Sequence, residues 1–252
     1  MKHCVITGAA DGIGKALAQR CGAAGYTITG IDRDAERAAA TEAELRQQGI
    51  SASFVVADLG QTADIDRVLD QLKAAPAIDV LIHNAGINAV GRFERSPIEQ
   101  QHAVLDVNLL APMLLTAELL RTQRVTAGGS LVFVASLSHF VGYPGAAVYA
   151  ASKDGLTAYA RSVAAARRDL HVLTVFPGPT RTAHARRYSP DNRREQRRMP
   201  PEELADVIYR AIEARRRYLI PGRSNQVFAA IGRYMPALTL FLLRKTLLEK
   251  LP

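Results

Sequence analysis

A tyrosine and a lysine four residues apart, Tyr149 and Lys153, are the pair in this chain best suited to acid–base chemistry. Residues four apart on a helix lie on the same side, so the phenol can lie near the ammonium. An unperturbed tyrosine titrates near pH 10, and lowering its pKa to about 7 requires roughly 4 kcal/mol. One positive charge about 4 Å away supplies a similar amount at an effective dielectric constant near 20. We therefore expect Lys153 to acidify Tyr149, so that the phenol can exchange a proton with a carbonyl or alcohol oxygen.

The elements that must position this pair are seven short apolar runs separated by helical patterns. The runs are rich in β-branched residues and apolar throughout, which is typical of parallel strands buried on both faces. The sequence therefore predicts one α/β domain over residues 1–252, with a doubly wound, seven-stranded, mostly parallel sheet and helices on both faces. We expect strands at 3–7, 26–31, 53–57, 80–83, 130–135, 172–176 and 218–220. We expect helices at about 12–24, 34–48, 62–74, 97–124, 147–168, 201–214 and 226–249, the fourth bent by Pro112.

A glycine-rich run, TGAADGIG over residues 7–14, follows the first predicted strand and opens the first helix. Glycines permit a tight turn and a close approach of the backbone to a pyrophosphate, and the helix N-terminus offers free N–H groups to an anion. In this context between strand and helix the pattern predicts a dinucleotide site. Its residues are Gly8, Asp11, Gly12, Ile13 and Gly14.

The second predicted strand runs into Asp32, followed by Arg33. An acidic side chain at this place can accept hydrogen bonds from both adenosine ribose hydroxyls, which favours NAD. A 2′-phosphate would meet like charge from Asp32 and from Asp11. Arg33 argues the other way, since it can bind that phosphate. We therefore expect NAD(H) to be preferred and NADP(H) to remain a second option.

Together these motifs resemble the classical type of the short-chain dehydrogenase/reductase family. TGxxxGIG, Asp58-Leu59 after the third strand, Asn84-Ala85-Gly86 after the fourth and YxxxK carry the resemblance, over roughly residues 2–182. It implies a Rossmann-type fold, Asp58 and Leu59 beside the adenine ring, and a stabilising turn at Asn84, Ala85 and Gly86. His83 stands where the family commonly has Asn, and we expect it to be a structural residue.

The same resemblance implies a catalytic tetrad of Asn108, Ser136, Tyr149 and Lys153. Ser136 would hold the substrate oxygen, with Ser138 and His139 as alternatives. Asn108 would position a water that relays protons through Lys153, and the lysine would also bind the nicotinamide ribose. After the sixth strand, the resemblance places Pro177, Gly178, Thr180 and Thr182 at the nicotinamide.

Beyond Thr182 an Arg-rich segment at about 180–200 stands where the family carries a substrate lid. It could bind an anionic group, or it could be a solvated surface. The apolar tail at about 226–252 could pack as a lid, pair with another subunit or lie on a membrane. The apolar side chains of this tail, together with Phe140 and Tyr143, favour a hydrophobic substrate. The Arg residues of the segment are Arg186, Arg187, Arg193, Arg194, Arg197 and Arg198.

Charge and composition narrow the classes of function. The chain has a formal net charge of +8, and residues 161–252 hold 19 Arg and Lys against 8 Asp and Glu. No aromatic and basic residues interleave as in a stacking platform, so nucleic acid is not expected as a partner. No run reaches the roughly 20 apolar residues of a membrane span. The start lacks a secretory signal, and two cysteines suit a reducing compartment, so we expect a cytoplasmic protein.

Three functions fit the sequence. The first is an NAD-dependent oxidoreductase acting on a hydrophobic secondary alcohol or ketone, assembled by family resemblance as a homodimer or homotetramer. The second is an NADPH-dependent 3-oxoacyl reductase of the fatty-acid type. The third is a non-catalytic dinucleotide sensor or a nucleic-acid-binding protein. We favour catalysis, because every position that handles a proton carries a chemically competent residue.

Overall fold

The chain folds into an α/β structure in the computed structural model, which describes residues 2–189, 192–193 and 195–250. The seven expected strands form one sheet in the order β3-β2-β1-β4-β5-β6-β7, and each neighbouring pair is parallel. The doubly wound class is therefore confirmed, with a sheet that is parallel throughout. The strands are β1 (Lys2–Thr7), β2 (Tyr26–Asp32), β3 (Ala52–Val56), β4 (Ile78–His83), β5 (Val125–Val134), β6 (His171–Val175) and β7 (Tyr218–Leu219).

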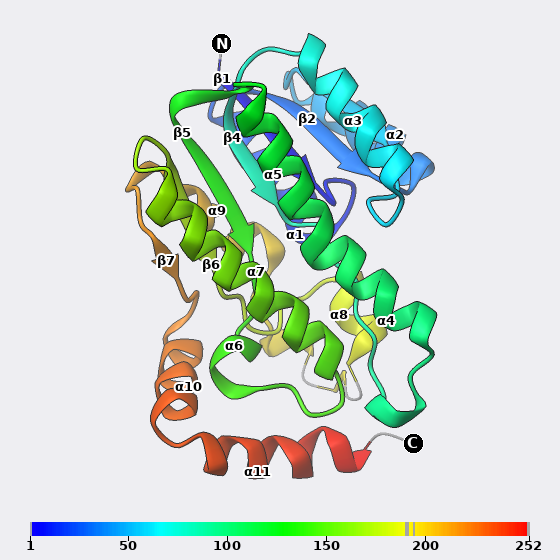
Figure 1. The fold of residues 1–252 in the computed structure, drawn as a ribbon, viewed down its shortest axis with the longest axis vertical. Coiled ribbons are helices and arrows are strands. Elements are labelled where there is room, and N and C mark those ends of the chain that lie inside the picture. The colour runs from blue at the N-terminus through cyan, green and yellow to red at the C-terminus, as the bar shows by residue number, and fades with distance from the viewer. Residues whose placement is uncertain (1, 190–191, 194, 251–252) are drawn as a thin grey trace.

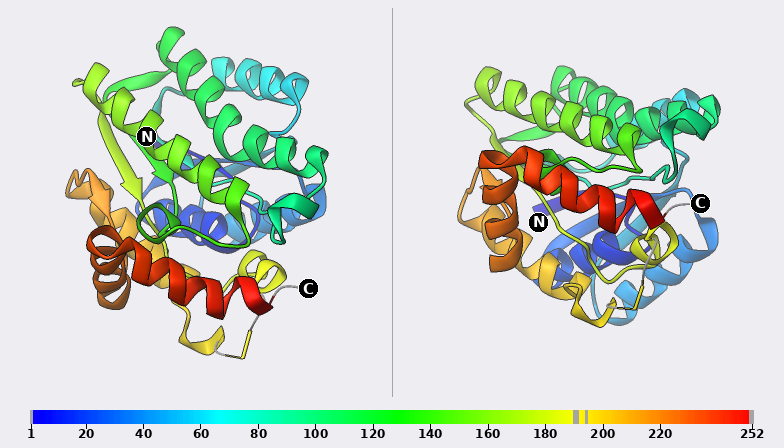
Figure 2. Two further views of the ribbon diagram at one scale, coloured as in Figure 1. Left: turned by 60° about the horizontal axis from the view of Figure 1, so that its bottom comes forward. Right: turned by 90° about the horizontal axis from the view of Figure 1, so that it is seen from below.

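Helices cover both faces of the sheet, as Figures 1 and 2 show. One face packs against α1 (Gly12–Ala23), α2 (Ala35–Gln47) and α9 (Pro201–Glu213). The other packs against α3 (Thr62–Ala74), α5 (Ala111–Arg121) and α7 (Ala147–Ala166). Shorter elements are α4 (Ile98–Leu105), α6 (Ser138–Val141), α8 (Ala183–Tyr188), η1 (Phe93–Arg95), η2 (Asp106–Leu110), η3 (Glu195–Arg197) and η4 (Leu248–Lys250).

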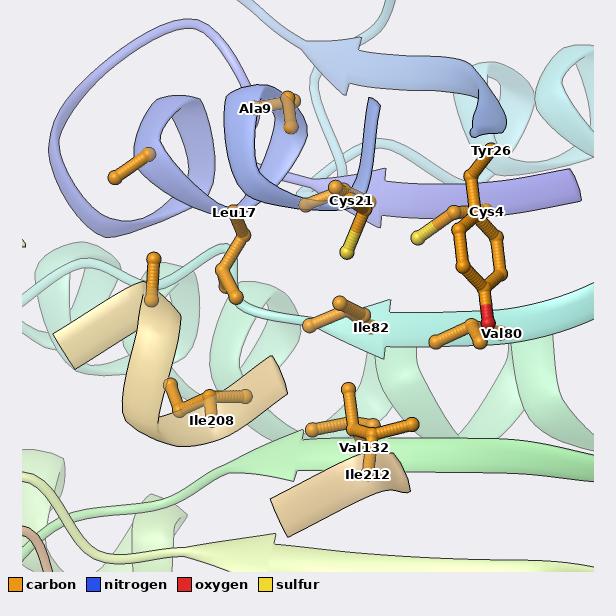
Figure 3. Packing of buried hydrophobic residues seen from close by; sticks show 14 of the residues in the cluster. Cys4, Ala9, Leu17, Cys21, Tyr26, Val80, Ile82, Val132, Ile208 and Ile212 are labelled. Atoms are coloured by element: carbon orange, nitrogen blue, oxygen red, sulfur yellow. The ribbon is translucent and has the colours of Figure 1, made fainter. Parts of the chain in front are cut away.

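The first core layer contains both cysteines. Figure 3 shows Cys4 on β1 and Cys21 on α1 among aliphatic side chains from β4, β5 and α9. Both are free and buried. Burial raises the pKa of the Cys4 thiol. Both sulfurs therefore act as small apolar groups that pack helix α1 onto the sheet.

The strand order places the loops that carry the motifs at one edge. The chain moves outward from β1 to β3 and then returns to β4 on the other side of β1. Parallel strands end at the same edge, so the segments after β1, β2, β4, β5 and β6 meet there. The reversal between β1 and β4 opens the crevice in which open α/β sheets bind ligands.

Two predicted helices differ from the structure. The helix expected at 97–124 is a continuous helical run, Ile98–Arg121, in which the π-helical turn η2 joins α4 to α5 directly before Pro112. The helix expected at 226–249 is two helices, α10 (Arg223–Tyr234) and α11 (Pro236–Thr246). They meet at a bend of 118°, because Pro236 cannot donate the hydrogen bond that would continue α10. Arg194 and residues 251–252 of the tail lie outside the described residues.

The run Ile98–Arg121 corrects the expectation that no segment is long and apolar enough to span a bilayer. These 24 residues, formed by α4, η2 and α5, meet that test by length and composition, and 44% of their most apolar window is buried inside the protein. Leu115 and Leu119 of α5 are fully buried against the sheet. The apolar character of this run is therefore explained by its place in the core.

Candidate active site

The turn after β1 is built for a close approach of backbone to ligand. Gly8 has φ of +66°, in the left-handed region that favours glycine. The Asn84 amide donates hydrogen bonds to the carbonyl oxygens of Thr7 and Gly8, each at 3.0 Å. The Thr7 hydroxyl accepts in turn from the backbone N–H groups of Asn84 and Ala85 at 3.0 Å. The loops after β1 and β4 therefore hold each other in place.

Gly14 lets helix α1 begin directly against this turn. A Cβ at Gly14 would lie 1.9 Å from the Gly8 carbonyl oxygen, so only glycine fits. A Cβ at Gly12 would lie 3.0 Å from Cγ2 of Thr182, which brings the loop after β6 onto the glycine turn. Asp11 caps α1 by accepting from the N–H of Gly12 at 2.7 Å. Gly8, Gly12 and Ile13 of this turn line a cavity, so the residues present fit a dinucleotide.

Acidic groups surround the predicted ribose position at the end of β2. The Asp32 carboxylate accepts from the N–H groups of Ala10 at 3.0 Å and Asp34 at 3.2 Å. Asp11 pairs with Arg37 at 3.1 Å, and Arg37 also pairs with Asp34. Two acidic residues therefore hold Arg37, a cation in the cavity wall that sequence reasoning missed. Its position one turn into α2 was the signal that could have revealed it.

The predicted residues gather around one cavity of about 1190 Å³. Gly14 and Asn108 are absent from its lining and lie behind the wall. The predicted residues that line it are Gly8, Asp11, Gly12, Ile13, Asp32, Arg33, Asp58, Leu59, Asn84, Ala85, Gly86, Ser136, Tyr149, Lys153, Pro177, Gly178, Thr180 and Thr182.

Tyr149 lies in the first turn of α7, and Lys153 follows one turn later. Their spacing is as expected, but the acidification is not: burial raises the pKa of Tyr149 to about 12. A hydrogen bond with Ser136 only partly opposes this. The Lys153 ammonium lies 6.0 Å from the centre of the Tyr149 ring and donates to the Val134 carbonyl at 2.8 Å. The expected pKa near 7 was wrong for this structure, because desolvation of the phenolate dominates the shift and the Lys153 charge is not among its causes.

Lys153 is itself fully enclosed, and burial lowers its pKa to about 8. Its side chain passes Gly86, whose Cβ position is 3.3 Å from the ammonium nitrogen. The ammonium therefore lies between the loop after β4 and the end of β5, beside the cavity wall. A residue with a side chain at Gly86 would press on it.

Asn108 supports this arrangement from behind. Its side-chain oxygen accepts from the Ile87 N–H at 2.8 Å, and its amide donates to the Ile87 carbonyl at 2.9 Å and the Ser152 hydroxyl at 3.0 Å. All three contacts are with protein groups, and the residue is fully buried. The side chain thus joins the loop after β4 to helix α7, and its expected role in a proton relay stays a prediction.

The structure separates the alternatives near Ser136. His139 pairs with Asp154 at 2.9 Å and stacks on Phe176, and it does not line the cavity. Ser138 does line the cavity, and its buried hydroxyl has no hydrogen-bond partner among the described residues. Of the two aromatic residues that favoured a hydrophobic substrate, Tyr143 lines the cavity, whereas Phe140 does not and packs its ring against Phe176.

His83 has the structural environment expected of it. The ring stacks on Phe133, and Nε2 lies 2.8 Å from the Thr116 hydroxyl. Burial lowers its pKa to about 3, with a smaller effect from the nearby Lys153 charge. His83 does not line the cavity. The imidazole is therefore neutral at physiological pH and lies behind the cavity wall.

The segment after Thr182 forms the far wall of the cavity. Thr182 caps α8 by accepting from the Ala185 N–H at 3.1 Å. Arg186 pairs with Glu195 at 2.7 Å, and Arg181 donates to Gln196 at 2.9 Å, so these two arginines hold the segment together. Arg187, Arg197 and Arg198 line the cavity.

His184 on α8 is a cavity residue that sequence reasoning missed. It lines the cavity and stacks at a tilt on Tyr188, with ring centres 4.8 Å apart. Burial lowers its pKa to about 4, and the Lys153 and Arg187 charges add to the shift. Its sequence signal was weak, because nothing near it marks a strand end or a motif.

Comparison with known proteins bears on this geometry. The family model described as short chain dehydrogenase matches residues 2–193. A human protein, 3-oxoacyl-[acyl-carrier-protein] reductase, is 34% identical over 180 residues, covering 70% of this chain and 75% of its own. A short-chain dehydrogenase from Sphingobium yanoikuyae, solved in complex with NADPH, is 25% identical with a TM-score of 0.79, covering 95% of this chain and 96% of its own.

A third similar protein is the bulky-bulky ketone specific alcohol dehydrogenase from Comamonas testosteroni. It is 25% identical with a TM-score of 0.78, covering 91% of this chain and 92% of its own. The family model covers more than half of this chain, and the two solved structures share its fold. The chain therefore belongs to the short chain dehydrogenase family and is an NAD(P)-dependent oxidoreductase.

Proposed function

We propose that the protein transfers a hydride between NAD(H) and a hydrophobic secondary alcohol or ketone, with Tyr149 exchanging the proton. One observation carries the proposal: Tyr149, Ser136 and Lys153 line the same cavity as the glycine turn. The cavity wall also includes a group of apolar side chains, which suits a bulky uncharged substrate. Its apolar residues are Leu137, Val141, Met199, Phe228, Leu243 and Leu247.

In ketone reduction the Tyr149 phenol would act as the proton donor. With its pKa raised to about 12, the Tyr149 phenol keeps its proton at neutral pH and can donate it to a carbonyl oxygen. A bound reduced nicotinamide would supply the hydride to the carbonyl carbon. Ser136 is close enough to hydrogen-bond to Tyr149 and would orient the same oxygen. The Lys153 ammonium would stabilise the phenolate left behind until solvent returns a proton.

NAD(H) is our proposed cofactor, with NADP(H) as the alternative. Asp32 ends β2 with both carboxylate oxygens in backbone hydrogen bonds, and beside the proposed ribose position such a fixed negative charge would disfavour a 2′-phosphate. Arg33 is exposed and lines the cavity beside it, which supports the alternative. Separate titrations with NADH and NADPH decide between them. Tighter binding of NADPH would contradict our proposal.

A 3-oxoacyl reductase is the second candidate function. The 34% identity to the human reductase favours it, and so do Arg187 and Arg197 in the cavity wall, which could meet the phosphate of an acyl carrier. Turnover of a 3-oxoacyl thioester, compared with that of a bulky aromatic ketone, separates the two.

We propose in addition that the enzyme is cytoplasmic and that it forms a homodimer or homotetramer. Light scattering tests the oligomeric state. A salt-sensitive gel shift with no turnover would support the non-catalytic alternative instead.

Replacing Tyr149 by phenylalanine tests the proposed proton donor. Tyr149→Phe removes the hydroxyl and keeps the ring, so we expect kcat for ketone reduction to fall about 10² to 10⁴-fold while NADH affinity changes little. Tyr159→Phe is the matched control, because that hydroxyl lies outside the cavity and donates to the Met113 carbonyl. Retained turnover in Tyr149→Phe would refute the role.

A further inference from the structure

Helix α10 leaves a stripe of apolar side chains exposed. Val227, Ile231 and Tyr234 follow one another at spacings of four and three residues, so they lie on one side of the helix. The Tyr234 side chain is 80% exposed. The other side of α10 carries the buried Ala229 and Gly232 and packs on α6. The packing of α10 on the rest of the protein therefore does not require this stripe.

Helix α11 is apolar on two sides. Two leucines line the cavity that contains Tyr149: Leu243 on α11, and Leu247, the residue directly after the end of α11. Leu238, Phe241 and Leu242 form a second stripe that is exposed to solvent, with Phe241 53% exposed. In Figure 2 the helix lies across the carboxyl edge of the sheet as the outermost element seen from below. One side of α11 thus encloses the cavity, and the other faces away from the protein.

Cations accompany the exposed stripes. Residues 223–249 contain Arg223, Arg233, Arg244 and Lys245 and a single acid, Glu249. The Lys245 ammonium lies 4.6 Å from the centre of the Phe241 ring, so a charged group stands directly beside the apolar stripe. This is the arrangement of an interfacial helix, whose rings enter the acyl boundary while its cations remain among headgroups.

The geometry separates a surface contact from other ways of covering these stripes. The 11 residues of α11 extend about 17 Å, and the bend of 118° prevents α10 and α11 from acting as one long helix. Neither can cross the roughly 30 Å of a hydrocarbon core. A second copy packed on the same face would bring a second surface with four cations and a single acid against the first, so like net charges would meet. Arg244 lies 3.7 Å from Glu249, and anionic headgroups would balance the remaining positive charge of the surface.

We propose that α10 and α11 dock the protein on an anionic lipid bilayer, with both helices lying in the interface. The stripes of Val227, Ile231 and Tyr234 and of Leu238, Phe241 and Leu242 enter the membrane. Because Leu243 and Leu247 line the cavity behind α11, docking places the cavity beside the acyl region. The last point rests on the proposed function, since it concerns the entry of a hydrophobic substrate, whereas the docking itself does not.

Co-sedimentation of the full-length protein with lipid vesicles tests the proposal without any measurement of turnover. The probes are phosphatidylcholine vesicles and vesicles of equal parts phosphatidylcholine and phosphatidylglycerol. We expect binding to the anionic vesicles, and removal of the apolar groups in Phe241→Ser/Leu242→Ser should weaken it by more than about 10-fold. Arg244→Gln/Lys245→Gln should weaken it about fivefold for each charge removed.

A matched control is Phe93→Ser/Ile98→Ser, which removes two exposed apolar side chains from η1 and α4. We expect it to bind vesicles like the wild type. The proposal is overturned if the wild type stays in the supernatant, or if neutral vesicles bind it as well as anionic ones. It is also overturned if Phe241→Ser/Leu242→Ser lowers the mass of the protein in solution, because a second copy then covers the stripe. Circular dichroism and NADH binding show that each variant is folded.

Discussion

Acid should destabilise this protein through His83, whose imidazole is buried at the end of β4 against Phe133. Burial lowers its pKa from 6.5 to about 3. Between these two pH values the unfolded chain binds a proton that the folded chain cannot accept, so unfolding becomes more favourable as the pH falls. One pKa unit corresponds to about 1.4 kcal/mol, and pH 5 is about 1.5 units below the unfolded pKa. His83 should therefore remove about 2 kcal/mol from the free energy of unfolding at pH 5 relative to pH 7.

The variant His83→Asn isolates this contribution. It loses stability at both pH values because the stack on Phe133 is lost, but its further loss between pH 7 and pH 5 should be about 2 kcal/mol smaller than that of the wild type. Urea unfolding followed by circular dichroism at the two pH values measures the difference. His102→Asn removes an exposed histidine from α4 and controls for the loss of an imidazole in general. Equal losses in wild type and His83→Asn would refute the reasoning.

Three further predictions concern the site. Burial lowers the pKa of Lys153 to about 8, so the ammonium is lost as the pH rises above about 8. The kcat for ketone reduction should therefore fall above that pH. A flat steady-state profile of kcat up to pH 10 would contradict this. Gly14→Ala places a Cβ 1.9 Å from the Gly8 carbonyl oxygen. The affinity for NADH, measured by fluorescence titration, should therefore drop at least about 10-fold. Unchanged affinity would argue against this turn as the cofactor site. Asn108→Ala removes the hydrogen bonds to Ile87 and Ser152. The free energy of unfolding, measured with urea, should therefore fall by about 2 to 3 kcal/mol. A decrease below about 0.5 kcal/mol would mean that these hydrogen bonds do not stabilise the fold.

Local signals in the sequence were sufficient for the sheet and for most of the site. Each strand is a short apolar run ended by a turn, and parallel strands must end at a common edge. Residues directly after β1, β2, β4, β5 and β6 therefore had to meet, and Gly8, Asp32 and Ser136 do line one cavity. The spacing of Tyr149 and Lys153 on one helix was likewise a local property that tertiary contacts did not alter.

Helix boundaries were less predictable where two local signals competed. The apolar pattern at 226–249 favoured one helix, but Pro236 divides it into α10 and α11, and the direction of α11 depends on its packing against α6. The π-helical turn η2 has no marked signal of its own. It places Asn108 where the side chain reaches both Ile87 and Ser152, which are distant in sequence.

Sequence alone determined which groups could carry out the chemistry and along which edge they would gather, because residue type and strand order are local or topological properties. Only the tertiary structure decided their protonation and their surroundings. Tyr149 was expected to be acidified by Lys153, yet burial raises its pKa to about 12 and lowers that of Lys153 to about 8. Solvent exclusion depends on every element packed around a group. No spacing of residues along the chain specifies it.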